Sequence, residues 1–167
     1  HAMNTFNDDL SVFGDGEMTL VESGDLCATV KSVTKSGKSV LKKYYTLYKN
    51  DFKLHIRCVL DVDEEYKLIK LSFPVNIENP KITYSMPYGF IEKQADGVED
   101  VAHEWADITD GKAGLGLIND GKYSHCALGN DIRIIAARSC AYLDHFAGEY
   151  RDKEMEFMDK GEQEFNL

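Results

Sequence analysis

Alternation of apolar and polar side chains, which begins at residue 52 and runs to residue 58, constrains the fold more than any other feature of this chain. The apolar members of the stretch are Phe52, Leu54, Ile56 and Cys58, and Leu60 continues their spacing. Because successive side chains of a strand point to opposite faces, this spacing predicts a strand with one buried face and one wet face that carries His55. Residues 40–48 alternate in a similar way, and the Lys-Asn-Asp sequence at 49–51 is typical of a turn. We therefore expect residues 40–60 to form a β-hairpin.

The same period of two recurs along most of the chain, and turn-forming Gly, Asn and Asp residues interrupt it at short intervals. Further strands are predicted at Glu17–Val21, Leu26–Val33, Val40–Tyr48, Lys67–Val75, Lys81–Met86, Leu115–Ile118, Tyr123–Leu128, Asp131–Ala137 and Glu154–Met158. Evidence for helix is thin, since Gly161 interrupts the charged segment 159–165. The pattern predicts an all-β sandwich of antiparallel strands with little helix. We interpret residues 1–3 as a cloning remnant and residues 4–167 as a single β domain.

The net charge of −10 bears on the possible partners of the chain. A negative field repels phosphate backbones and anionic lipids, so neither nucleic acid nor a membrane surface is an expected partner. No apolar run approaches the roughly 20 residues that a membrane-spanning helix needs. The four cysteines are scattered without a C-x-x-C pair, which favours buried thiols over zinc or redox chemistry. Free thiols also indicate a reducing compartment, and we expect a cytoplasmic location.

The sequence carries no recognisable catalytic or metal-binding motif. Its histidines belong to no H-x-D, H-x-x-H or H-E-x-x-H pattern, so no metal ligands are predicted. No serine lies in the G-x-S-x-G motif that marks a nucleophilic serine of hydrolases. Among the many carboxylates, Asp107, Asp110 and Asp120 are the best placed for acid–base chemistry. Turn formation nevertheless explains aspartate at such positions without catalysis.

Two further features could belong to a functional surface. Trp105 is the only tryptophan, and it could stack on a sugar ring or, more commonly, fill a core or a domain interface. The turn at Asn119–Tyr123 combines amide, carboxylate, ammonium and phenol groups. It could be a plain hairpin turn or a lip that binds hydroxyl groups or docks another domain.

An ordered set of short motifs resembles the C-terminal domain of glycoside hydrolase family 38, the α-mannosidases. The matching stretches are Lys67–Val75 ending in F-P-V, Tyr84–Lys93 similar to P-F-G-x-I-E-R, His103–Asp107 similar to H-x-W-x-D, Gly116–Tyr123 similar to L-L-N-D-x-K-Y-G, Arg138–Tyr142 similar to R-S-P-x-Y, and Gly161–Phe165 similar to G-E-H-E-F. The chain departs from these patterns at Val62, Ser124, Cys140 and Gln163. The departures suggest a divergent, bacterial branch of the family.

The resemblance implies a galactose mutarotase-like supersandwich that belongs to a retaining, zinc-dependent exo-α-mannosidase. Its nucleophile, acid and zinc ligands would lie in an N-terminal catalytic barrel outside these 167 residues, which would be the chief partner of this domain. No catalytic or metal residue is therefore expected here, and the chain alone should be inactive on mannose-containing glycans. The turns at 110–113 and 119–123 would form part of the active-site rim or brace the barrel. The candidate residues are Lys112, Asn119, Asp120, Lys122, Tyr123 and Trp105.

A second hypothesis is a free-standing carbohydrate-binding β-sandwich that recognises glycans without cleaving them. A third possibility is a purely structural domain that stabilises homo-oligomer contacts. Leu167 is expected to fall where the family's sheet continues, so an exposed strand edge there would be prone to self-association. Titration with mannose oligosaccharides would separate the first two hypotheses.

Overall fold

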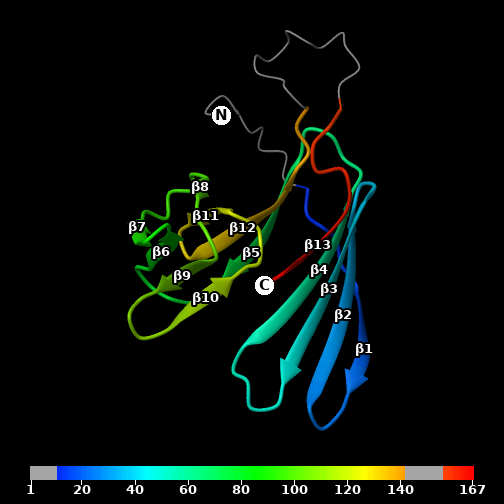
Figure 1. The fold of residues 1–167 in the computed structure, drawn as a ribbon, viewed down its shortest axis with the longest axis horizontal. Coiled ribbons are helices and arrows are strands. Elements are labelled where there is room, and N and C mark those ends of the chain that lie inside the picture. Colours follow the sequence, from blue (N-terminus) through cyan, green and yellow to red (C-terminus); the bar gives the residue numbers. More distant parts are fainter. Residues whose placement is uncertain (1–10, 142–155) are drawn as a thin grey trace.

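The structure is a computed structural model that describes residues 11–141 and 156–167, and in these ranges it is all-β without helix. The strands are β1 (Glu17–Ser23), β2 (Cys27–Ser36), β3 (Ser39–Tyr48), β4 (Leu54–Val62), β5 (Leu68–Pro74), β6 (Lys81–Met86), β7 (Gly89–Lys93), β8 (Asp100–Val101), β9 (Trp105–Thr109), β10 (Gly114–Ile118), β11 (Ser124–Leu128), β12 (Asp131–Arg138) and β13 (Gly161–Asn166). They form three antiparallel sheets (Figure 1). The predicted all-β class with antiparallel strands is confirmed.

A five-stranded sheet in the order β1-β2-β3-β4-β13 contains the predicted hairpin. Strands β3 and β4 pair from Leu47 opposite Leu54 to Val40 opposite Asp61. The turn between them places Asn50 at a φ of 64°, in the left-handed region that asparagine tolerates better than most residues. The predicted buried face of β4 holds from Ile56 onward. Phe52, however, is wrong for that face, because it precedes the strand and is fully exposed.

Two four-stranded sheets, β10-β9-β6-β7 and β5-β12-β11-β8, make up the rest of the described fold. Strand β12 links its sheet to both hydrophobic cores. Its Ile134 lies opposite Leu71 of β5 and packs with Leu60 of the five-stranded sheet. Its Ile132 packs instead with Ile82 and Ile108 of the β10-β9-β6-β7 sheet. Phe73 of β5 is in contact with both clusters, so the sheet that contains β12 supports the other two.

The C-terminal part of the chain differs from the sequence-based prediction. A strand was expected at Glu154–Met158, but residues 154 and 155 lie outside the described ranges. Of the remainder, only Phe157 forms a bridge, which is with Ala141. The strand is β13, which runs along β4 at the edge of the five-stranded sheet and buries Phe165 (Figure 1). Strands β7, β8 and β9 were not predicted either.

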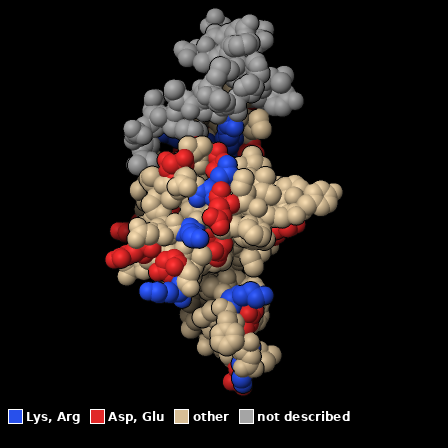
Figure 2. Space-filling model, turned by 90° about the vertical axis from the view of Figure 1, so that its left-hand side faces the viewer, with Lys and Arg blue, Asp and Glu red and all other residues tan. Residues whose placement is uncertain are grey.

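Charge is mixed on the face of the molecule that Figure 2 presents. Figure 2 shows acidic and basic side chains interspersed on the face it presents, which spreads the net negative charge instead of concentrating it in one place. Across the part of the chain that is described, no helix has the length and hydropathy to cross a membrane.

Candidate functional site

The turn at Asn119–Tyr123 joins β10 to β11, and its first residue is buried. The Asn119 side chain donates from Nδ2 to the backbone oxygen of His103 at 3.0 Å. Its Oδ1 accepts from the backbone N–H groups of Gly121 at 3.0 Å and Lys122 at 2.7 Å. All three bonds hold the turn in shape. Asn119 is therefore a structural residue of the turn rather than a group free to bind a ligand.

Asp120 ties the same turn to the C-terminal strand. Its Oδ1 accepts from the backbone N–H of Asn166 at 2.8 Å, and its Oδ2 accepts from Nδ2 of that residue at 2.6 Å. The backbone N–H of Asp120 donates to the Asn166 oxygen at 3.3 Å. Charge-assisted bonds of this kind are stronger than neutral ones. Asp120 thus anchors the free end of β13.

Lys122 completes this attachment, and Tyr123 remains accessible beside it. The Lys122 ammonium donates to Oε1 of Gln163 at 2.8 Å and lies 4.8 Å from the centre of the Phe165 ring. Burial lowers the pKa of Lys122, although the nearby carboxylates of Asp159 and Asp120 act in the opposite direction. The Tyr123 ring lies 5.7 Å from that of His103 and is about half exposed. We call the attachment of Asp120 and Lys122 to β13, together with the Asn119 bonds that shape their turn, the β13 clasp.

Lys112 does not join this group. It is exposed in the turn between β9 and β10, where Asp110 accepts from the backbone N–H groups of Lys112 at 2.8 Å and Ala113 at 2.9 Å. These bonds lower the pKa of Asp110 and show it in the turn-forming role that the sequence favoured. Strand β10 separates the turn from the β13 clasp by roughly 16 Å. The two predicted parts of one rim therefore lie at opposite ends of a strand.

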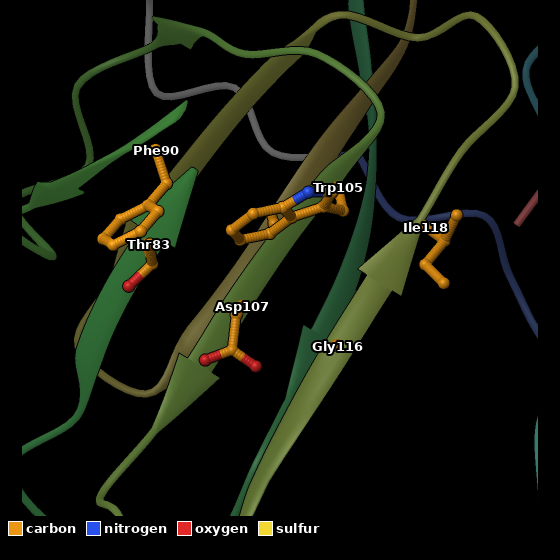
Figure 3. A pocket seen from close by; sticks show the side chains of 7 residues that line it. Thr83, Phe90, Trp105, Asp107, Gly116 and Ile118 are labelled. Atoms are coloured by element: carbon orange, nitrogen blue, oxygen red, sulfur yellow. The ribbon is translucent and has the colours of Figure 1, made fainter. Parts of the chain in front are cut away.

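Trp105 lies on the outer face of the β10-β9-β6-β7 sheet, next to Ile118 on the neighbouring strand. Together with Phe90 it borders an open pocket with a volume of about 420 Å³ (Figure 3). The pocket is lined by Thr83, Phe90, Trp105, Ala106, Asp107, Gly116 and Ile118. Trp105 is thus neither a core residue nor a member of the β13 clasp, although it is close to the clasp end of β10.

Asp107 places a carboxylate in this pocket, across the strand pair from Thr83. Burial raises its pKa. Among the residues that the structure describes, neither this carboxylate nor the Thr83 hydroxyl nor the Trp105 indole N–H has a hydrogen-bond or ion-pair partner. The sequence singled out Trp105 and Asp107 but did not place them in one pocket. It missed Thr83, Phe90 and Gly116, whose positions depend on how β6, β7 and β10 pair with β9.

The other histidines and the cysteines that the structure describes form no second candidate active site or metal site. His55 is half exposed, with its Nε2 2.9 Å from Oδ2 of Asp51. All four cysteines are free, and Cys58 and Cys126 are buried as predicted, while Cys27 and Cys140 are partly exposed. Within residues 11–141 and 156–167, no group of three or more His, Cys, Asp or Glu residues could hold a metal ion. The described residues therefore offer no fit for zinc.

Comparison with known proteins decides the family. The profile of the glycosyl hydrolases family 38 C-terminal domain matches residues 3–146, which is most of the chain. The chain belongs to this family. The motifs between residues 67 and 142 lie inside the match, so the resemblance seen in the sequence is confirmed, and the 161–165 motif lies beyond it.

Curated relatives of this family 38 domain are α-mannosidases. The chain is 25% identical to alpha-mannosidase G of Dictyostelium discoideum over 75% of its own length and 13% of that protein. It is 29% identical to alpha-mannosidase 2C1 of Mus musculus and 32% identical to an alpha-mannosidase of Saccharomyces cerevisiae, in each case over 46% of this chain and 8% of the relative. The chain thus spans only a small part of each of these relatives. Its expected bacterial origin stays a prediction.

Proposed function

We propose that this family 38 domain is the accessory scaffold of a retaining, zinc-dependent exo-α-mannosidase, and that it packs on a catalytic barrel in another part of the parent polypeptide. The observation that carries the proposal is the match to a C-terminal family domain in a chain that spans 8 to 13% of its α-mannosidase relatives. Hydrolysis of terminal α-mannosides and a zinc ion in the barrel belong to this proposal, and so does a cytoplasmic location. The chain alone is expected to be inactive.

An exposed apolar surface supports docking against further protein. The face of the five-stranded sheet that carries the core also carries Met18, Leu20, Leu47 and Leu54 beyond the core, all of them substantially exposed. The strands that carry these residues, β1 to β4, extend past the other two sheets (Figure 1). Soluble monomers rarely expose contiguous apolar patches of more than a few hundred Å². Burial of this face by the rest of the parent chain would remove it from water.

The β13 clasp supports a more specific role for the end of the domain that carries Asn119–Tyr123. Its hydrogen bonds leave Asn119 and Asp120 little capacity for a ligand, but they fix the position of the exposed Tyr123 phenol beside His103. A phenol on a rigid support can hydrogen-bond to a sugar hydroxyl or to a neighbouring domain at little entropic cost. In this proposal, the clasp positions the rim and Tyr123 makes the contact.

The parent enzyme provides the test, with turnover of an aryl α-mannoside as the assay. Tyr123→Ala, Asn119→Ala and Asp120→Ala are each expected to reduce kcat/KM, the first without a change in thermal unfolding. Lys112→Ala is the matched control, because it removes an exposed side chain at the other end of β10 and is expected to leave both quantities unchanged. If kinetics stay at the wild-type level in all three rim and clasp variants, the rim proposal is refuted.

A further inference from the structure

The outer face of the β10-β9-β6-β7 sheet carries aromatic and polar groups that the scaffold role leaves unexplained. The inner face of this sheet packs Ile82, Tyr84 and Ile108 into a core. The outer face carries the partly buried Trp105 and the largely exposed Phe90 (Figure 3). A large aromatic residue on the wet face of a sheet gains little for stability unless a partner covers it.

The polar groups of this pocket are placed like a recognition site. Thr83 on β6 lies opposite Asp107 on β9, which in turn lies opposite Gly116 on β10. A hydroxyl group, a carboxylate and a glycine therefore lie side by side on three adjacent strands. A Cβ atom at Gly116 would meet nothing nearer than an Asp107 carboxylate oxygen at 4.0 Å, which shows open space at the centre of the face. In the described part of the chain, the indole N–H, the hydroxyl and the carboxylate are all unpaired and reachable from solvent. A bound molecule could use all three.

We infer that this face is a binding site for a neutral pyranose, in which Trp105 and Phe90 stack on the ring while Asp107, Thr83 and the indole N–H bond its hydroxyls. The apolar C–H face of a pyranose suits an aromatic ring, and its hydroxyls both donate and accept. Asp107 is the only charged residue among the seven described residues that line the pocket, so an anionic ligand would meet repulsion. Among neutral sugars, the choice of α-mannosides rests on the proposed function.

The single tryptophan gives a direct readout with the intact 167-residue chain. Titration with a linear α-mannotriose is expected to change Trp105 fluorescence in a saturable way. Asp107→Asn should weaken the apparent affinity about tenfold, the size expected when a charge-assisted hydrogen bond is lost. Gly116→Val should abolish the response by filling the open centre of the pocket, where a Cβ atom approaches only an Asp107 carboxylate oxygen at 4.0 Å.

Gly89→Val is the matched control for the glycine substitution. A Cβ atom at Gly89 meets nothing within 4 Å, and Gly89 is not a lining residue of the pocket. This variant should bind like the wild-type chain, and circular dichroism should show all three variants folded. The absence of a saturable response, or an unchanged response in both Gly116→Val and Asp107→Asn, would overturn the site. An equal response to maltotriose would retain the pyranose site and overturn the assignment to mannosides.

These outcomes are separate from those of the rim variants in the parent enzyme. A silent titration with this chain would leave the effect of Tyr123→Ala in the parent enzyme intact. Conversely, wild-type kinetics in the Tyr123 and β13 clasp variants would leave fluorescence binding at Trp105 intact. The pocket and the rim can therefore fail independently.

Discussion

The buried imidazole of His125 predicts a specific loss of stability in mild acid. His125 lies on β11 with no exposed surface, its ring 5.7 Å from that of Tyr84, and neither ring nitrogen has a hydrogen-bond partner among the described residues. Burial lowers its pKa from 6.5 to about 4. Between these two values the unfolded chain binds a proton that the folded chain does not. Stability from this residue is therefore fully present above pH 6.5 and is lost as the pH falls toward 4.

The size of the effect follows from proton linkage. Acidification from about pH 7 to about pH 4.5 should cost roughly 2 kcal/mol of unfolding free energy through His125 alone. His125→Leu removes the titrating group and the two unpaired nitrogens while keeping a side chain of similar size. The variant should equal or exceed the wild type in stability near neutral pH, because no buried polar atom is left without a partner.

Urea unfolding at a series of pH values measures this difference. Carboxylates also titrate in the range, so the quantity to compare is the change in unfolding free energy of wild type minus that of His125→Leu. As the pH falls from about 7 to about 4.5, the wild type should lose roughly 2 kcal/mol more unfolding free energy than His125→Leu. Parallel pH profiles for the two proteins would refute the reasoning, because they would show that His125 has the same pKa in the folded and unfolded chains.

Two further changes test the core and one strained turn. Leu60→Ala should destabilise the chain by about 2–5 kcal/mol, because Leu60 is fully buried between two sheets. The control Leu26→Ala, at an exposed position, should change the free energy of unfolding by less than about 0.5 kcal/mol. Similar unfolding midpoints of the two variants in urea would contradict the assignment of the core. Tyr88→Asn should stabilise the chain by about 0.5–1 kcal/mol, because Tyr88 is fully exposed at a φ of 66°, which asparagine adopts more readily than tyrosine. The matched change Tyr66→Asn, at a φ of 55°, should bring no such gain, since Tyr66 packs edge-on against Phe157, and thermal unfolding of both variants measures the contrast.

Local sequence pattern predicted the strands of the described chain apart from β7, β8, β9 and β13, and its failures have physical causes. Strand β4 was predictable because Ile56, Cys58 and Leu60 alternate with polar residues. Strand β9 buries Ala106 and Ile108, but alanine and aspartate favour strands too weakly to reveal it. Strand β13 buries little besides Phe165 and is rich in glutamate, so its conformation comes from backbone pairing with β4, about a hundred residues earlier.

The candidate site divides in the same way. Asp110 and Asn119 were recognisable as turn formers, because an aspartate or asparagine bonds backbone groups two or three residues ahead. Lys112 and Asn119 lie beyond opposite ends of β10, which became evident only when residues 114–118 were seen to form one strand. Thr83 and Phe90 could not be assigned to the pocket of Trp105, since nothing in their local sequence reveals which strands they adjoin.

By itself, the sequence of this family 38 domain determined an all-β fold, the antiparallel hairpin at residues 40–60 and membership of the family to which its α-mannosidase relatives belong. Those properties reside in local alternation and in short ordered motifs, which survive without knowledge of the fold. Only the tertiary structure decided that Asp120 bonds to Asn166, 46 residues away, and that Asp107 lies in the pocket of Trp105 with no partner in the described ranges. The reason is that a carboxylate takes its role from the donors that folding brings within hydrogen-bonding distance, and those donors come from distant strands.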